Sequence, residues 1–392
     1  TRRVNMRAEK IEVDLGASGS RLCQKKGIVD TLPNNMVFLG LEDQISLVPY
    51  TESVVDSLEV FIRREGAVDN DVFPCHVLMG SMAERYSASN ERPSVGINKL
   101  DQRVNHVSAL VAAAYLKMKH SCGDNIMLYM ALPPIEVRDG KITANEKLCG
   151  KYTLDFPKFN GGQTVELEIS EVRCYEESYL ALMSFLFTPE GKIKEEHKDC
   201  TRGYTLSMDI GASTSDFALM KNGQYQEKSG KTYKIGGNVA REYLTDRIRE
   251  KFGYDLPVEE AEVTMREGRV RVGATYQIVT DLIEEAKEEL AKQISAMLGS
   301  YFRQIDIPIQ MIGNIVVSGG GSMESSYVDE SGNVVKTSNP TAVYLVDYIH
   351  RICEEVNVVY YGKDSRLANI TGLFIQASVD EFLESQNKKV YY

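Results

Sequence analysis

The segment Leu206–Phe217 (LSMDIGASTSDF) decides how this chain is interpreted, because it joins an apolar strand, a strand-end aspartate and a turn of small residues. A near-copy, Ile11–Ser20 (IEVDLGASGS), lies close to the N-terminus. Each copy predicts a strand, a tight turn and a second strand. Glycine and serine let the backbone N–H groups of such a turn approach a phosphate, and the aspartate supplies an oxygen ligand for hydrated Mg²⁺. Two such hairpins predict a clamp on the phosphates of a nucleotide from both sides.

One hairpin of this kind is a common turn, so the inference depends on its duplication and on a third motif. That motif is Ile315–Ser322 (IVVSGGGS), which predicts a buried strand running into a glycine turn. Glycines there would let the backbone lie flat against a base or a ribose. Three glycine motifs in this order favour a nucleotide site over three unrelated turns.

These motifs resemble those of the actin–sugar kinase–chaperone ATPase superfamily. The two hairpins look like its "phosphate 1" and "phosphate 2" motifs, and Gly319–Ser322 looks like its "adenosine" turn. Cys174–Ala181 and Leu367–Phe374 resemble its two connecting elements. The resemblance implies an α/β, actin-like fold: two duplicated βαβ-rich domains around a nucleotide cleft, each with a small insertion.

Within the superfamily, the chain is most similar to ParM-type bacterial plasmid-segregation actins. Glu177-Ser178 is similar to the Pro-Glu-Ser of that group, with Glu176 in place of the proline. Further resemblance lies in Lys234–Val239, Ile278–Ala286 and Val77–Tyr86.

Composition sets the broad class of the protein. With 392 residues, 43% apolar and 26% charged, the chain predicts a globular protein of two domains. Its net charge of −11 argues against broad non-specific binding to DNA or to anionic membranes. Seven scattered cysteines without C-x-x-C spacing argue against a disulfide framework or a zinc site and favour a reducing cytoplasm. The sequence shows no signal peptide and no apolar run long enough to span a membrane.

The expected organisation is two βαβ-rich halves. Domain I covers 1–203, with an insertion at about 41–95, and is completed by 362–392; domain II covers 204–361, with an insertion at about 237–275. Hydrophobic patterning predicts strands at 10–15, 57–64, 74–79, 125–132, 204–209, 216–221 and 313–318, β structure at 141–174, and a hairpin at 325–338. It predicts helices at 100–120, 177–187, 238–252, 276–299, 341–355 and 366–385.

Hydrolysis of a nucleotide requires positioning, charge neutralisation and an oriented water. Asp14 and Asp209 are the expected Mg²⁺ ligands, mostly through water, and Asp209 also belongs to the expected catalytic set; the alternative is an aspartate bonding its own turn. Glu177 is the candidate that orients the attacking water or accepts its proton. Its alternatives are a helix cap and a one-residue shift that gives the role to Glu176. Asp216 joins the water network or only anchors its hairpin.

The resemblance assigns nucleotide contacts to the turns. The expected residues are Gly16, Ala17, Ser18, Gly19, Gly211, Ala212, Ser213, Thr214, Gly237, Arg266, Gly319, Gly320, Gly321 and Ser322. Two features depart from relatives: the first hairpin lacks a phosphate-facing lysine, although Arg21 is near, and Arg266-Glu267 stands where eukaryotic actins have Lys-Glu against the adenosine. Surface pairing explains Arg266-Glu267 equally well. ATP is expected from the resemblance alone, and GTP stays open.

The function implied by the resemblance is a filament-forming ATPase that uses ATP or GTP with Mg²⁺. Subunits would join head-to-tail in a contact that does not close, and hydrolysis would weaken the filament. The expected partners are further copies of the chain and a small DNA-binding adaptor of a plasmid partition system, with no direct contact to nucleic acid or membrane. The alternative is a small-molecule (sugar-type) kinase or another cytoskeletal actin-like protein.

Overall fold

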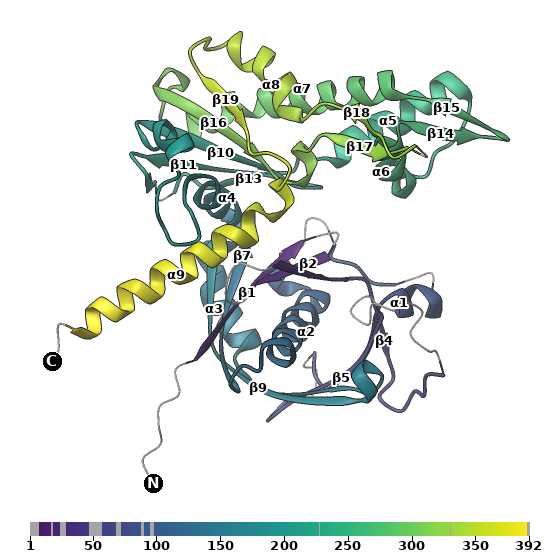
Figure 1. Ribbon diagram of the computed structural model, residues 1–392, viewed down its shortest axis with the longest axis vertical. Coiled ribbons are helices and arrows are strands. Elements are labelled where there is room, and N and C mark those ends of the chain that lie inside the picture. Colours follow the sequence, from purple (N-terminus) through teal and green to yellow (C-terminus); the bar gives the residue numbers. More distant parts are fainter. Residues whose placement is uncertain are drawn as a thin grey trace.

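The computed structural model describes residues 8–16, 19–23, 29–46, 57–67, 72–87, 90–94, 98–226, 228–329 and 331–389. Figure 1 shows two lobes. One is built around the strands β1 (Glu9–Gly16), β7 (Asn125–Leu132) and β9 (Gln163–Glu176), and the other around β10 (Tyr204–Ile210) and β16 (Ile312–Ser318). The helix α9 (Ala368–Lys389) runs from the second lobe along the first.

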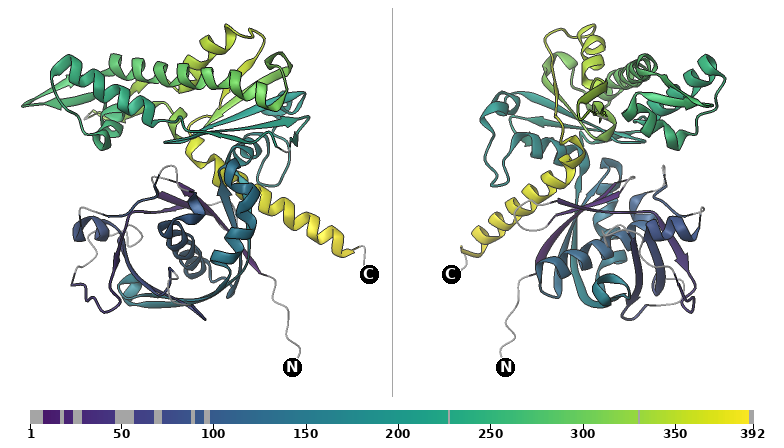
Figure 2. Two further views of the ribbon diagram at one scale, coloured as in Figure 1. Left: turned by 180° about the vertical axis from the view of Figure 1, so that it is seen from behind. Right: turned by 45° about the vertical axis from the view of Figure 1, so that its right-hand side comes forward.

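The first lobe holds a nine-stranded mixed sheet that uses the strands from both the first hairpin and the expected insertion. Its order is β3 (Val29–Leu32), β2 (Gly19–Cys23), β1 (Glu9–Gly16), β7 (Asn125–Leu132), β9 (Gln163–Glu176), β8 (Gly150–Phe156), β5 (Ser57–Arg64), β6 (Cys75–Gly80) and β4 (Met36–Leu39). The sheet curves around α2 (Arg103–His120), as the rear view in Figure 2 shows. Alternate residues of β1, Ile11, Val13 and Leu15, point into this core, in keeping with the two-residue period of a strand.

The second lobe holds a smaller sheet that repeats the central arrangement of the first. Its order is β12 (Gln224–Tyr225), β11 (Ser215–Lys221), β10 (Tyr204–Ile210), β16 (Ile312–Ser318) and β19 (Asn357–Tyr360), with β13 (Lys231–Tyr233) also paired to β11. In each lobe a central strand pairs antiparallel with the next strand and parallel with a distant one: β1 with β2 and β7, β10 with β11 and β16.

The remaining elements cover the sheets or project from them. Two further hairpins are β14 (Arg269–Val272) with β15 (Thr275–Ile278), and β17 (Ser325–Val328) with β18 (Val334–Ser338). The other helices are α1 (Ser81–Tyr86), α3 (Pro134–Leu148), α4 (Glu177–Leu186), α5 (Asn238–Phe252), α6 (Val258–Glu267), α7 (Thr280–Ile305), α8 (Thr341–His350) and α9 (Ala368–Lys389). Among the described helices, none combines the length and apolar character needed to cross a membrane.

Most elements predicted from the sequence are present, and three predictions were wrong. Residues 141–148, predicted as β structure, form the second half of α3, which starts at Pro134, a favoured residue for the first position of a helix. The helix predicted at 276–299 starts at Thr280, because 275–278 form β15. The helix predicted at 341–355 ends at His350, and the unpredicted strand β19 follows. The two-domain division with its insertions stays a prediction.

Helices α4 and α9 cross where the lobes meet. A Cβ on Gly372 of α9 would lie 2.9 Å from the Cα of Leu180 in α4, and closer still to the Leu180 carbonyl oxygen. Only a residue without a side chain permits this approach. The crossing lies next to β1, β7 and β10, so it fixes α4, and with it Glu177, between the two central strands.

Candidate nucleotide site

Each central strand ends in a buried aspartate beside its glycine turn. Asp14 pairs with Arg21 across the first hairpin, and Asp209 pairs with Asp216 across the second. The aspartates are only 3% and 5% exposed. Because the two strands occupy equivalent places in their sheets, the duplication read from the sequence places two carboxylates at corresponding positions.

The first hairpin carries an arginine that folds over its turn. The guanidinium Nη1 of Arg21 lies 3.3 Å from Asp14 Oδ2, and a Cβ on Gly16 would stand 2.7 Å from the same nitrogen. Gly16 and Gly19 face each other across the turn, whereas Ala17 and Ser18 lie outside the described residues. Arg21 therefore places positive charge at a hairpin whose turn has no lysine.

The second hairpin is tied by its backbone to the segment before α5. The carbonyls of Gly211 and Ala212 accept hydrogen bonds from the backbone N–H groups of Gly237 and Asn238, at 2.9 and 2.7 Å. The side-chain amide of Asn238 also donates to Ser213 Oγ, at 3.1 Å. Gly211, Ala212, Ser213 and Gly237 are thus brought together as one rigid unit.

Asp216 is held inside its own sheet. Its Oδ1 accepts from Thr232 Oγ1 at 2.6 Å, and Thr214 Oγ1 lies 3.5 Å from its Oδ2. Both carboxylate oxygens therefore have partners within the hairpin and the neighbouring strand β13. This favours the anchoring role that the sequence left open for Asp216.

The third glycine motif packs directly on the second hairpin. Gly319 has a φ of +88°, and a Cβ there would lie 2.7 Å from the carbonyl carbon of Ile210. A Cβ on Gly321 would lie 2.7 Å from the Gly211 oxygen. Ser322 is fully buried, and its hydroxyl donates to the Gly319 carbonyl at 2.7 Å. The hydroxyl of Ser322 thus stabilises the turn from inside, which differs from its expected role as a nucleotide contact.

Glu177 lies at the start of α4 and forms an ion pair that the sequence did not predict. The ammonium of Lys99, from the short 3₁₀ segment Lys99–Asp101, donates to Glu177 Oε1. Both side chains are largely buried, at 20% and 10% exposure. The backbone N–H of Lys99 donates to Glu136 Oε2 at 2.8 Å, and its carbonyl accepts from Asn105. Hydrogen bonds therefore hold the backbone of Lys99 in place, and its ammonium group supplies the charge that pairs with Glu177.

The neighbouring carboxyl groups influence one another. Burial, reinforced by the Glu177 charge, raises the pKa of Asp209 to about 7, although Asn369 opposes the shift by donating to Asp209 Oδ2 at 2.8 Å. Burial and the same charge raise the pKa of Asp216. Burial also raises the pKa of Glu177, with Lys99 as the main opposing influence. We call Asp14, Glu177, Asp209 and Asp216 the carboxylate cluster. Carboxyl groups with perturbed pKa values, such as Glu177, Asp209 and Asp216, are typical of functional sites.

Glu176 faces a different environment from Glu177. Its carboxylate accepts a hydrogen bond from the Tyr225 hydroxyl in β12, and a Cβ on Gly230 would lie 2.9 Å from its Cδ. It therefore contacts the second lobe, while Glu177 contacts Lys99. Of the two alternatives, this geometry favours Glu177 as the residue that faces a reacting water.

A cavity of about 290 Å³ lies next to the third glycine motif. Its lining includes the predicted residues Gly237, Gly320, Gly321 and Arg266. It also includes residues that the sequence patterns did not indicate, namely Arg241, Glu262, Lys287 and Arg366. The volume is at the lower end of the range for small-molecule sites, which suits the base and ribose of a nucleotide better than all of it.

Charged residues from three helices brace this cavity. Glu262 of α6 pairs with Arg241 of α5 at 3.0 Å and with Arg366 at 3.2 Å. Lys287 of α7 donates to the carbonyls of Gly321 and Met323, at 3.3 and 2.9 Å. Burial lowers the pKa of Lys287 to about 8, and nearby arginines add to this. The pairing of Glu262 could not be read from the sequence, because its partners lie 21 and 104 positions away.

Within the described residues, no three or more Asp, Glu, His or Cys side chains are arranged to hold a metal ion. The carboxylate oxygens of Asp14 and Asp209 are of the type that Mg²⁺ prefers, and Mg²⁺ commonly keeps several of its waters in proteins.

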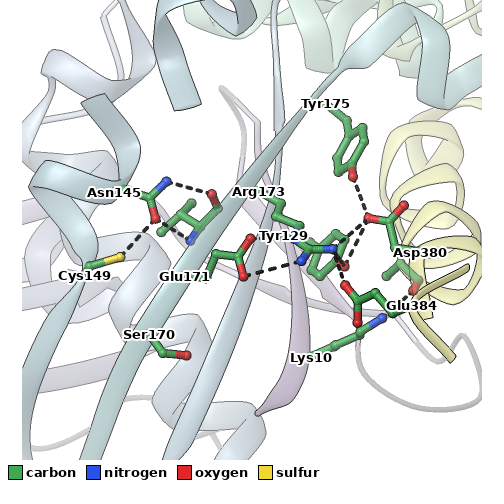
Figure 3. Close-up of polar contacts among 12 residues, drawn as sticks. Lys10, Tyr129, Asn145, Cys149, Ser170, Glu171, Arg173, Tyr175, Asp380 and Glu384 are labelled. Carbon is green, nitrogen blue, oxygen red and sulfur yellow. Dashed lines mark hydrogen bonds and ion pairs between the residues drawn. The ribbon is translucent and has the colours of Figure 1, made fainter. Parts of the chain in front are cut away.

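A second cavity, of about 400 Å³, lies on the first lobe between α3, β9 and α9 (Figure 3). Figure 3 shows Arg173 reaching Asp380 and Glu384 on α9, with Tyr129 and Tyr175 around them. The Tyr175 hydroxyl donates to Asp380 Oδ2 at 2.5 Å. These contacts fasten the C-terminal half of α9 to the sheet.

Comparison with known proteins agrees with the geometry. The family model described as archaeal actin homologue MreB-like, C-terminal, matches residues 207–326, which run from the second hairpin to beyond the third glycine motif. No curated protein matches the chain by sequence.

Similar solved structures are actin homologues. The actin-like protein Alp7A is 17% identical, with a TM-score of 0.72 over 99% of this chain and 100% of that one. The archaeal actin homologue Ta0583 in complex with ADP is 16% identical, with a TM-score of 0.64 over 94% and 99%. A subunit of a 15-stranded ParM filament from Clostridium botulinum is 16% identical, with a TM-score of 0.64 over 96% and 100%. The predicted actin-like fold, and the resemblance to actin homologues that include ParM, are confirmed.

Proposed function

We propose that this protein is a filament-forming actin-like nucleotidase that polymerises with ATP or GTP and Mg²⁺ in the cytoplasm and drives the segregation of plasmid DNA. The observation that carries the proposal is the convergence of two strand-end aspartates, the buried Glu177 and the third glycine turn between the two lobes. Solved actin homologues with the same fold include an ADP complex and a ParM filament.

Nucleotide hydrolysis requires little from the protein beyond positioning the reacting groups and neutralising the charge on the phosphates. The turns after Asp14 and Asp209 would present backbone N–H groups to the phosphates, and Arg21 would add positive charge. Glu177, at the start of α4, would orient the attacking water and accept its proton. The base and ribose would occupy the cavity lined by Arg266 and Gly320.

The cluster also supports a bound cation. The charges of Lys99 and Arg21 act on Glu177, and repulsion among the four buried carboxyl groups contributes to the raised pKa values of Asp209 and Asp216. Asp14 and Asp209 would hold Mg²⁺ through its waters, and the ion would neutralise charge on the phosphates.

Polymerisation would follow from closure of the lobes around the nucleotide. Head-to-tail contacts between copies would extend the filament, and hydrolysis would relax the closure and weaken those contacts. A small DNA-binding adaptor would link the filament to plasmid DNA, so the filament itself would contact neither nucleic acid nor membrane.

The proposal is tested by 90° light scattering of the purified protein with Mg-ATP, Mg-GTP and a non-hydrolysable analogue, with phosphate release measured in parallel. Rapid assembly that decays as phosphate appears, but persists with the analogue, is the expected result, and it would identify the nucleotide. Flat scattering with no turnover of either nucleotide would refute the proposal. Turnover that needs an added small-molecule acceptor would favour the kinase alternative.

A further inference from the structure

We propose that Lys99 is a positioning residue that keeps the Glu177 carboxylate charged and aimed at the attacking water, an inference that rests on the proposed nucleotidase function. Neither the glycine motifs nor the expected catalytic residues include Lys99. It comes from the segment before α2, 78 positions away from Glu177.

The backbone of Lys99 is held on both sides. Its N–H is bound by the carboxylate of Glu136, at the start of α3, and its carbonyl is bound by the Asn105 side chain at 2.9 Å. The next residue, Leu100, is buried and accepts at its carbonyl from His106. Because the main chain is fixed in this way, the long side chain has a defined origin from which to reach Glu177.

The charges around Glu177 show why a cation is needed there. The titratable groups that influence it from neighbouring elements are one lysine, one arginine and four acids: Lys99, Arg21, Asp14, Glu136, Asp209 and Asp216. Burial and the acids favour the protonated form of Glu177, and the Lys99 charge is the largest influence against it. Without Lys99, a buried glutamate among these acids would take up a proton and could no longer accept one from water.

The surroundings of Lys99 also favour its charged form. Burial disfavours the charged ammonium, but Glu177, Asp14 and Glu136 together raise the pKa of Lys99 above its usual value. Lys99 therefore stays charged throughout the range in which Glu177 changes its charge. A permanent cation beside this buried carboxylate opposes the upward shift of its pKa and so favours the charged form, which can accept a proton from water.

The first test reads the protonation of Glu177 in the nucleotide-free protein. Glutamate side chains are labelled with ¹³C at the carboxyl carbon, and the Glu177 signal is assigned with Glu177→Gln. In Lys99→Met the titration midpoint of Glu177 should rise by at least about one pH unit, while Lys99→Arg should stay close to the wild type. An unchanged midpoint in Lys99→Met would overturn the inference, whether or not the protein hydrolyses nucleotides.

The second test is the pH profile of phosphate release. Lys99→Met should shift the rising limb of the profile to higher pH, with about tenfold lower turnover at pH values below the wild-type midpoint, because there a rise of one pH unit in the midpoint lowers the ionised fraction of Glu177 about tenfold. Lys99→Arg should restore most of the turnover. If Lys99→Arg loses as much as Lys99→Met, with both profiles keeping the wild-type midpoint, charge is not what Lys99 supplies and the inference fails.

Lys158 provides the matched control. It lies in the turn after β8, is 25% exposed and pairs at 2.8 Å with Glu59 of β5, a carboxylate only 6% exposed. Lys158→Met therefore removes an equally buried lysine–glutamate pair outside the carboxylate cluster. Its profile of phosphate release should match the wild type. If the wild-type protein hydrolyses no nucleotide, the proposed function fails. The carboxyl titration of Glu177 then tests by itself whether Lys99 keeps Glu177 charged.

Discussion

Replacing Gly372 with alanine should destabilise the protein, although the same change in a helix normally stabilises it. Gly372 lies inside α9, where alanine is favoured over glycine by about 1 kcal/mol of intrinsic helix propensity. At this position, however, the new methyl group would meet the backbone of Leu180 at 2.9 Å or less. A backbone contact cannot be relieved by rotating a side chain, so α4 and α9 must move apart.

The magnitude follows from two opposing effects. Inserting a methyl group into a well-packed contact costs about 1–3 kcal/mol, and a clash with several backbone atoms of Leu180 favours the upper end. Subtracting about 1 kcal/mol of helix propensity leaves a loss of about 2 kcal/mol in the free energy of unfolding. With a urea dependence of about 3 kcal/mol per M, the midpoint should fall by roughly 0.7 M.

Gly299 in α7 is the control for this prediction. A Cβ there would lie 3.7 Å from Arg303 Nη1, the far end of a flexible side chain, which is an ordinary contact. Gly299→Ala should therefore raise stability by up to about 1 kcal/mol. Urea unfolding followed by far-ultraviolet circular dichroism measures both variants. If Gly372→Ala moves the midpoint upward, as Gly299→Ala should, the close crossing of α4 and α9 is wrong.

Three further predictions test other parts of the molecule. Burial raises the pKa of Glu12 to about 8 from an ordinary value of 4.5, so over this range the folded state binds a proton that the unfolded state has released. The free energy of unfolding should therefore fall by up to about 1.4 kcal/mol per pH unit between roughly pH 5 and 8. Urea midpoints should fall less steeply with pH in Glu12→Gln than in the wild type, and an equal slope would contradict the raised pKa. Lys287→Met should weaken nucleotide binding by about tenfold in calorimetric titration, because the carbonyls of Gly321 and Met323 lose their hydrogen-bond donor. An unchanged affinity would show that the glycine turn keeps its shape without Lys287. Arg173→Met should speed amide exchange in the C-terminal half of α9, because the ion pairs to Asp380 and Glu384 are lost, and exchange at the wild-type rate would mean that apolar packing alone holds the helix.

The parts of this fold that the sequence predicted are those that local chemistry determines. The strand-end aspartates and glycine turns were predictable because tight turns require small residues at fixed positions. Helix α3 was missed because its sequence, with Gly140 in the middle and a nearly even mix of polar and apolar residues, lacks a clear helical period. Strand β19 was missed because its four residues, NVVY, carry too few positions for an alternation to be read.

The roles of Glu176 and Glu177 could not be separated in the sequence, because adjacent residues at the junction of a strand and a helix differ only in the direction they face. The structure separates them through their partners: Tyr225 in the second lobe binds Glu176, and Lys99 in the first lobe binds Glu177. No sequence motif marks Tyr225 or Lys99 as a partner of these glutamates. Both are brought to the glutamates by the tertiary fold, and Lys99 needs only a fixed backbone and a side chain long enough to reach Glu177. The absence of a lysine from the turn of the first hairpin therefore does not leave this acidic site without one. The charge that the site requires comes from a segment 85 positions after Asp14. The four acids of the carboxylate cluster and the adjoining Glu136 influence one another, and this repulsion indicates that a cation belongs there.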